Sequence, residues 1–310
     1  MAMTLVEAAK SAANQGAVLR SSIIELYAMN SEVLRTLPFN NISGNALRYN
    51  REETLPGVGF RGVNEAYTED IGVINPVTEP LVIAGGDLDV DKFILATMGQ
   101  EQRGIREAMK VKGVAHRWTK AFIKGDSTSD PREFDGLQVR LTGTQKIQAG
   151  STANGTPLSL AKLDEVIDAV DSPTHLIMNR TMRRLLSAAA RTTSVGGFIT
   201  YAPDEFGRQV SFYNGLPILI VDQDNNGSDI LQFDEAATSG TATATSIYCV
   251  SLQEGMLTGI QNGGMQVTDL GELQTKPVFR TRVEWYAGVA LFHPKAAARL
   301  WSISNATVTV

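Results

Sequence analysis

The chain has 310 residues, of which 43% are hydrophobic and 20% charged, and its formal net charge is −5. A chain of this length buries about 75% of the surface that it exposes when unfolded, so it can fold without disulfides or metals, and its negative charge argues against binding nucleic acid by overall attraction. No apolar run approaches the ~18 residues of a membrane span, and no basic-then-apolar leader follows Met1, so we expect a soluble, unexported product.

Charged residues are grouped in blocks along the chain. Seven acids and no base lie between Glu65 and Asp91, and eight acids and no base lie between Gln209 and Thr275. Between these blocks stands a basic run with only one acid in it: Arg103, Arg106, Lys110, Lys112, Arg117, Lys120 and Lys124. Blocks of opposite sign suit a subunit that presents different charges to different neighbours.

The first 86 residues offer little apolar material for a core of their own. Residues 1–45 contain one amphipathic stretch that ends at Pro38, and we expect it to dock on the body of the chain or to reach another chain. Residues 46–86 are rich in glycine and proline, and between these residues lie extended pieces at 46–50 and 71–74. This pattern predicts a two-stranded excursion that rests on another surface, either of the same chain or of a neighbour.

The strongest helical pattern covers residues 89–124. Aspartates at 87, 89 and 91 would lie at its start and lysines at its end, as the helix dipole favours. The pattern would be interrupted near Gly99, Gly104 or Gly113.

The rest of the chain predicts a mixed α/β region followed by long strands. A Gly/Ser/Thr-rich connection at 142–157 indicates a domain boundary. The expected elements are a strand at 137–141, a helix capped by Ser159, a strand at His175–Met178, a helix capped by Asn179, a hairpin turn at Asn214 and Gly215, three long strands within 246–292, and a short helix at 295–301 after Pro294.

Catalytic motifs are missing from the sequence. His116, His175 and His293 lie far apart, and Cys249 stands in an apolar stretch that predicts a buried, inert thiol. The aspartates at 87, 89 and 91, and those at 222 and 224 before Gly227, imitate calcium loops but lack the closing glutamate, so capping and turn formation are the better interpretations. We therefore expect no enzyme activity, cofactor or metal.

Several segments occur in the order found in the major capsid proteins of tailed bacteriophages, the Hong Kong 97-like capsid family. The segment from Arg48 to Gly72, RYNREETLPGVGFRGVNEAYTEDIG, resembles the E-loop of these proteins in its arginine-bearing strand, its LP turn and its FRGVNEAY stretch. The resemblance continues in FDGL from Phe134, HLIMNRTMRRLL from His175, YNGLPILIVD from Tyr213 and RVEWYAGVALFHPKAAARL from Arg282. The resemblance extends over the whole chain, and it rests on the order of the segments.

The resemblance implies an α+β chain with the Hong Kong 97-like capsid fold. Its parts would be an N-terminal arm at 1–45, an E-loop at 46–86, a peripheral domain at 87–145 and 252–293, an axial domain at 146–251 and a C-terminal segment at 294–310. In this family the arm and the E-loop reach adjacent subunits. The peripheral domain holds a long spine helix with long antiparallel strands, and the α/β axial domain packs around the five- and six-fold axes.

The function that this resemblance implies is structural. The chain would assemble as hexamers and pentamers into an icosahedral phage head, in the host cytoplasm, and would enclose double-stranded DNA without sequence specificity. Further partners would be a portal, a decoration or cement protein and, since the chain lacks the fused scaffold of some relatives, a separate scaffolding protein or none. The alternatives are an encapsulin-like compartment around protein cargo and, in another class, a soluble α+β enzyme without a recognisable motif.

The resemblance also assigns candidate contact residues. The E-loop residues expected to touch a neighbouring subunit are Arg51, Arg61, Glu65, Glu69 and Asp70. The basic run from Arg103 to Lys120 would face the shell interior or an acidic neighbour, with an ordinary solvated helix face as the alternative.

Some members of the family join neighbouring subunits by an isopeptide bond between an E-loop lysine and an asparagine. Here no lysine occurs between Lys10 and Lys92, and the E-loop carries only arginines. A guanidinium stays protonated and is a poor nucleophile. We therefore expect the subunits to be held together without covalent bonds.

Overall fold

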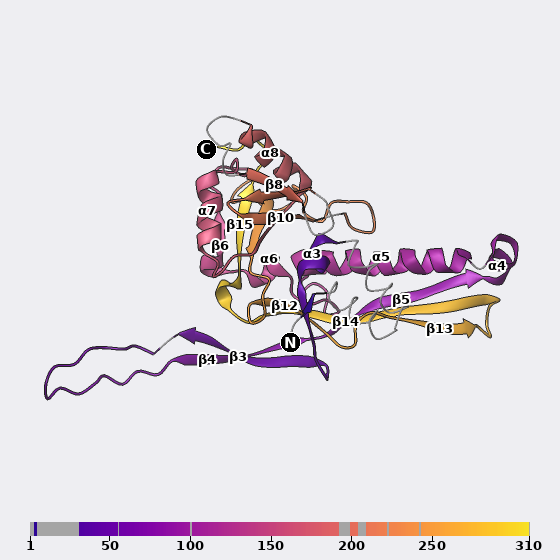
Figure 1. Ribbon diagram of the computed structural model, residues 1–310, viewed down its shortest axis with the longest axis horizontal. Coiled ribbons are helices and arrows are strands. Elements are labelled where there is room, and N and C mark those ends of the chain that lie inside the picture. Colours follow the sequence, from indigo (N-terminus) through magenta and orange to yellow (C-terminus); the bar gives the residue numbers. More distant parts are fainter. Residues whose placement is uncertain are drawn as a thin grey trace.

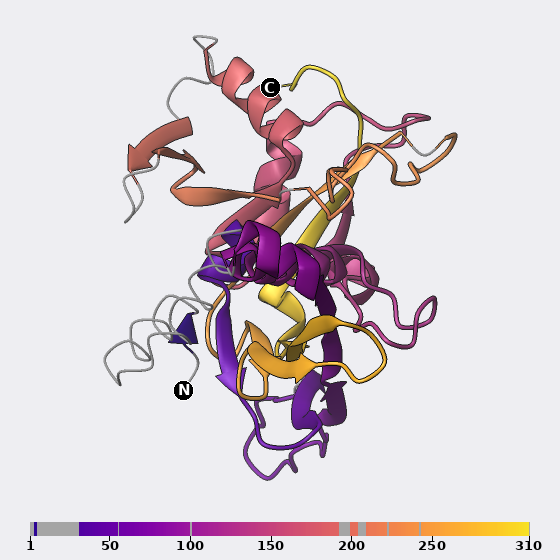
Figure 2. The ribbon, with the colours of Figure 1, turned by 90° about the vertical axis from the view of Figure 1, so that its right-hand side faces the viewer.

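Two sheets, a long helix and a projecting hairpin set the shape of the molecule (Figure 1). The computed structural model describes residues 3–4, 31–54, 56–99, 101–191, 199–203, 209–221, 223–241 and 243–309. Seen along the long helix α5, the seven-stranded sheet with its helices lies on one side of it and the six-stranded sheet with the hairpin on the other (Figure 2). Helix α5 (Glu101–Lys124) therefore forms the middle layer of the body.

The strands within the described residues pair in three sheets. The six-stranded sheet consists of β1 (Met3–Thr4), β2 (Pro38–Asn41), β12 (Leu257–Gln261), β14 (Val278–Leu291) and β13 (Gln266–Glu272) in that order, with β5 (Val82–Asp91) also paired to β14. The seven-stranded sheet has the order β6 (Lys146–Gln148), β15 (Ala297–Ile303), β11 (Thr245–Val250), β7 (His175–Met178), β10 (Leu216–Ile220), β9 (Gln209–Tyr213) and β8 (Ile199–Pro203). The hairpin consists of β3 (Ala46–Thr54) and β4 (Val73–Pro80).

Apart from α5, the helices within the described ranges are mostly short. They are α3 (Glu32–Thr36), α4 (Lys92–Met98), α6 (Leu137–Arg140), α7 (Leu160–Asp168) and α8 (Arg180–Ala190), with 3-10 turns at η1 (Gly143–Gln145) and η2 (Pro294–Ala296).

The long predicted helix is present as α4 and α5, and the predicted interruption at Gly99 is confirmed. Gly99 has a φ of 88°, which favours glycine, and its N–H donates to the Leu95 carbonyl at the end of α4. The chain therefore turns between the two helices at a residue that lacks a side chain.

The prediction that this helix begins at about residue 89, with the aspartates at 87, 89 and 91 at its start, is wrong, because all three belong to the last part of β5. Strand β5 pairs with β14 along ten consecutive residues, from Val82 opposite Ala287 to Asp91 opposite Val278. Its alternating burial fits a strand with one face on α5, and this long-range pairing outweighs the local helical pattern. Only Asp91 caps α4, by accepting the N–H of Phe93 at 2.8 Å.

Aromatic side chains fill the core between α5 and the six-stranded sheet. The ring of Trp118 on α5 lies 5.6 Å from those of Phe39 on β2 and Trp285 on β14, and 5.3 Å from that of Phe122. The indole N–H of Trp285 donates to the side chain of Gln261 at 3.1 Å, so this buried polar atom has a partner. Each ring buries ~150–250 Å², which makes this cluster a main source of stability for the body.

The described end of the predicted N-terminal arm docks on the body of its own chain. Ser31 caps α3, and the apolar side chains Val33, Leu34 and Leu37 are fully buried. Pro38 ends the helical pattern and begins β2, which pairs with β12 and β1. The earlier amphipathic residues, including Val18 and Ile23, lie outside the described residues.

Most predicted elements around the seven-stranded sheet are confirmed. Helix α7, strand β7 and helix α8 lie where the patterns place them, and the side chain of Asn179 accepts the N–H of Met182 at 2.7 Å. Asn214 and Gly215, with φ values of 48° and 80°, form the turn between β9 and β10. Ser159 stands at the N-cap position of α7, but its side chain makes no capping hydrogen bond.

Two short predictions in this region are wrong. Residues 137–141 form the helical turn α6 with its C-cap rather than a strand, since a short apolar run does not distinguish the two. Residues 297–303 form β15 rather than a helix, and only η2 follows Pro294. The alanines favour a helix locally, but β15 is almost entirely buried between β11 and β6, so pairing decides its conformation.

His175 at the start of β7 predicts a measurable pH dependence. Burial lowers its pKa to about 4. Because this is below the unfolded value of ~6.5, the neutral imidazole stabilises the fold above pH ~6.5, and that contribution is lost as the pH falls toward 4. We expect a loss of up to ~3 kcal/mol in unfolding free energy from this residue.

Urea unfolding of the wild type and of His175→Gln, each measured at about pH 7 and about pH 4.5, isolates this contribution. Other acid-sensitive groups act equally in both proteins. The variant should lose less stability on acidification, and equal losses would contradict the prediction.

Candidate functional site

The projecting hairpin ends in a distal loop, residues 56–72, that has no helix or strand. In Figure 1 the loop extends well beyond the body of the molecule. Its large apolar side chains are unusually exposed: Val58 at 95%, Phe60 at 110%, Val63 at 92%, Tyr67 at 68% and Ile71 at 88%. Large apolar side chains exposed together in this way are typical of surfaces that bind another protein.

Four of the predicted E-loop contact residues lie in this distal loop. Arg61 stacks on the Tyr67 ring, with 5.2 Å between guanidinium and ring centroid, and donates to the Glu65 carbonyl. Asp70 accepts the N–H of Gly57 at 2.6 Å. Glu69 is exposed, and Arg51 lies apart from these residues, on β3 opposite Asn75. The loop is thus internally braced but carries charges directed outward.

The base of the hairpin is anchored by residues that no sequence pattern singled out. The guanidinium of Arg140 donates to both carboxylate oxygens of Glu79, which is only 6% exposed. Tyr49 packs on Phe292 at 4.7 Å and donates to the Leu291 carbonyl at 2.7 Å. Burial, followed by the charge of Glu79, raises the pKa of Tyr49 to about 12. These contacts fix the direction in which the hairpin leaves the body.

The basic run on α5 is largely paired within the chain. Arg103 contacts Glu107 and Asp269, and the remaining pairs are Arg117 with Glu133, Lys120 with Asp224, and Lys124 with Asp234. Lys110 lines the pocket between α5 and β5, where its charge helps to lower the pKa of Asp87, whereas Arg106 and Lys112 form no salt bridge with any described residue. A role of this run toward a neighbour or an interior therefore stays a prediction, with Arg106 and Lys112 as the side chains most available for it.

The second half of the acidic block also finds partners in the same chain. Asp87 accepts from Arg282 at 2.7 Å and Asp89 from Arg280 at 2.6 Å, across the paired strands β5 and β14. These hydrogen bonds hold the pKa of both aspartates below the ordinary value. Their interpretation as helix-capping residues is therefore wrong, because they form a ladder of ion pairs on the open face of the sheet.

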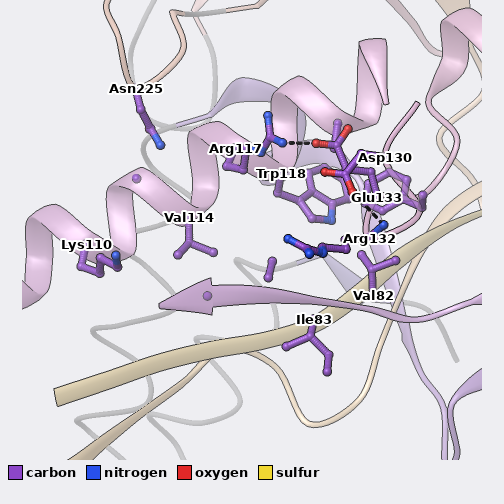
Figure 3. Close-up of a pocket in the computed structure, with 15 residues that line it drawn as sticks. Val82, Ile83, Lys110, Val114, Arg117, Trp118, Asp130, Arg132, Glu133 and Asn225 are labelled. Carbon is purple, nitrogen blue, oxygen red and sulfur yellow. Dashed lines mark hydrogen bonds and ion pairs between the residues drawn. The ribbon is translucent and has the colours of Figure 1, made fainter. Parts of the chain in front are cut away.

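A pocket of about 300 Å³ lies between α5 and β5 (Figure 3). Arg117 and Glu133 form an ion pair at its rim, and Arg132 points into it beside Trp118. Its lining residues include no nucleophile next to a general base. The lining therefore contains no pair of side chains arranged for nucleophilic catalysis.

The other candidates for chemistry are structural. Cys249 is fully buried, as predicted, and burial raises the pKa of its thiol to about 12. Asp222 lies outside the described residues, whereas Asp224 accepts the N–H groups of Asn226 and Ser228 and pairs with Lys120. Within the described ranges, no three His, Cys, Asp or Glu side chains gather in a way that could hold a metal ion.

In the part of the chain that the structure describes, no helix is long and apolar enough to cross a membrane.

Comparison with solved structures identifies the fold. The SrpI encapsulin from Synechococcus elongatus PCC 7942 superposes with a TM-score of 0.65 at 17% identity, covering 90% of this chain and 89% of that one. The capsid of a native GTA particle gives 0.64 at 15% identity, covering 89% and 91%, and a protein of Microbacterium phage Oxtober96 gives 0.61 at 14% identity, covering 90% and 91%. The chain has the Hong Kong 97-like capsid fold.

The predicted α+β Hong Kong 97-like fold is thereby confirmed over nearly the whole chain. No protein-family model matches the sequence, and no curated protein matches it either. At these low identities the likeness establishes the fold alone.

Proposed function

We propose that this chain is the major capsid protein of a tailed bacteriophage and assembles into the icosahedral head that encloses double-stranded DNA. The observation that carries this proposal is the distal loop, whose exposed apolar side chains make no contact with the described body, on a chain that has a capsid fold over about 90% of its length. A loop of this kind is stabilised when it lies on a second copy.

The division of the chain follows from this proposal. The E-loop corresponds to the hairpin β3–β4 with its distal loop, the peripheral domain to α5 with the six-stranded sheet, and the axial domain to the seven-stranded sheet with α7 and α8. Strand β5 crosses the predicted boundary at residue 86 and belongs to the peripheral sheet through its pairing with β14. In hexamers and pentamers the axial domains would meet at the symmetry axes.

The shell would have no catalytic role. Its partners would be further copies of itself, packaged DNA held without sequence specificity, a portal, and a scaffolding or cement protein. The protein would be located in the virion, after assembly in the host cytoplasm. The similarity to the SrpI encapsulin favours one second candidate, a compartment that encloses protein.

Expression of the full chain tests the proposal. Sedimentation and cryo-electron microscopy should reveal closed shells built of five- and six-membered rings, and shells recovered from phage-infected cells should contain double-stranded DNA. Shells that contain protein and no DNA would support the compartment instead. A chain that remains monomeric at every concentration tested would overturn both functions.

Mature particles should dissociate completely in hot detergent. The distal loop carries Arg61 and no lysine, and no described lysine lies on the hairpin, so the isopeptide reaction lacks its amine. A denaturing gel should show a single band at the 33.4 kDa of the monomer. A ladder of covalent multimers would contradict the expectation, and reducing agent should make no difference because Cys249 is buried.

A further inference from the structure

Helices α7 and α8 lie on the same face of the seven-stranded sheet. Leu163 of α7 and Met182 of α8 belong to one buried cluster with Leu176 and Met178 of β7, whereas Ile177 belongs to the cluster on the opposite face. Helix α7 contacts β15 and β11, and α8 contacts β10. Given the strand order, α7 lies toward the β6 edge and α8 toward the β8 edge, and Figure 1 shows them at two sides of this module.

Helix α8 carries a basic surface in an acidic protein. Residues 172–203 contain four arginines and no acid, although the net charge of the chain is −5. The exposed members are Arg180, Arg184 and Arg191, and Arg183 is half-buried with an Nε that has no partner among the described residues. Two of the four stand in the first turn, where the helix dipole is positive and disfavours further positive charge.

Helix α7 shows the opposite arrangement. Residues 159–171 contain four acids and only one base, Lys162, and the four acids Asp164, Glu165, Asp168 and Asp171 are all exposed. Asp168 is the last residue of the helix and Asp171 follows it, where the helix dipole is negative. Helix α8 therefore carries positive side chains at its positive end, and α7 carries negative side chains at its negative end.

Only some of these charges are paired within the described residues, for example that of Asp171, which lies 3.8 Å from Nδ1 of His293. Glu165 pairs with Lys162 and Asp164 accepts from Tyr213, but neither Asp168 nor Arg184 forms an ion pair with any residue in the described ranges. Placing a basic helix start next to an acidic helix end removes both local costs, because each dipole then meets charge of opposite sign.

We propose that, around each symmetry axis of the shell, α8 of one subunit docks on the acidic side of α7 in the next subunit. The two surfaces differ, so the contact is head-to-tail, and such contacts generate rings where the rotation between neighbours closes, as it does around a symmetry axis. Their positions toward opposite edges of one sheet face suit a ring in which every subunit uses both surfaces once. This inference rests on the proposed capsid function and names the partner surface of the axial domain.

Charge reversal tests the contact. Arg184→Glu and Asp168→Arg each place like charges in contact at every position of a ring, and each should reduce the yield of particles about tenfold. The double variant Arg184→Glu/Asp168→Arg restores opposite charges with the order exchanged and should recover most of the yield. Both residues are exposed, so circular dichroism and thermal unfolding should stay unchanged.

Lys162→Glu is the matched control, since it alters the net charge by the same amount as Arg184→Glu but makes α7 more acidic. It should assemble as the wild type does. Loss of assembly in this control equal to that of Arg184→Glu, or failure of the double variant to recover, would overturn the inference.

Two further outcomes separate this inference from other possibilities. Normal particles from Arg184→Glu with reduced DNA content would show that α8 binds phosphate rather than a subunit, and would overturn the inference. A wild type that forms no particles under any condition would refute the capsid function itself, whereas a wild type that assembles beside an unaffected Arg184→Glu would refute only the contact.

Discussion

A variant that lacks residues 52–68 should fold as stably as the full chain and form no closed particles. The hydrogen bonds and ring contacts of the distal loop lie within the loop itself, for example Gly57 with Asp70 and Arg61 with Tyr67, so its removal takes no support from the body. The deletion joins Arg51 to Glu69 and leaves the base of the hairpin paired, including Leu47 opposite Glu79.

The expected loss of assembly has a physical cause in the exposed apolar side chains. Burying one such side chain at an interface is worth about 1.5–3 kcal/mol, and each subunit of a shell would lose several of these contributions at once. Thermal unfolding measures the fold, and electron microscopy with sedimentation measures assembly. Particles that form normally from the shortened chain would contradict the proposed role of the loop.

A second variant distinguishes the effect of shortening the loop from the effect of removing its apolar side chains. Replacing Val58, Phe60 and Val63 with serine keeps the loop and removes three side chains that are at least 92% exposed. It should impair assembly nearly as much as the deletion does. Replacing Glu254, an exposed acid in a loop of the body, with glutamine provides the matched control and should have no effect.

Arg299→Met should lower the free energy of unfolding by about 3–5 kcal/mol, because it leaves a buried carboxylate without its counter-charge. Arg299 and Glu235 have side chains only 6% and 3% exposed, and a guanidinium nitrogen lies 2.8 Å from the carboxylate oxygen. Ser246 accepts from Arg299 at 2.9 Å and donates to the same oxygen of Glu235, so the three side chains form a buried network.

The double variant Arg299→Met/Glu235→Leu is the control, since it removes both charges and fills the space with apolar atoms. It should regain most of the lost stability, because replacing a buried pair by apolar residues is often close to neutral. Urea unfolding of dilute, unassembled protein provides the measurement. A loss below ~1 kcal/mol in the single variant, or a double variant as unstable as the single one, would contradict this account.

Parts of the fold that depend on neighbouring residues could be predicted from the sequence. The turn at Asn214 and Gly215 follows from their tolerance of positive φ, and the start of α8 follows from the capping side chain of Asn179. The alternating side chains of β14 and the interruption of the helix at Gly99 were predictable for the same reason. The exposed distal loop was also predictable, because its composition leaves it without a core.

For the charged residues, the sequence predicted blocks of like charge but not which residues pair with one another. The sequence places acids near Asp87 and bases near Arg282, but nothing in it says that they meet across a sheet 195 residues apart. The same holds for the anchor of the hairpin, in which Glu79 and Arg140 are separated by 61 residues. The reversed dipole charges on α7 and α8 were readable in advance, whereas their positions on one face of a sheet were not.

The sequence by itself determined those helices, strands and turns that depend on residues close together in the chain, through apolar spacing, capping side chains or turn-forming residues. It also determined that the projecting hairpin has no lysine. Only the tertiary structure decided that residues 87–91 and 297–303 are strands, and which charges remain without a partner in the described chain. The reason is that backbone pairing and burial between distant segments contribute more than local propensity, which is worth only a few tenths of a kcal/mol per residue.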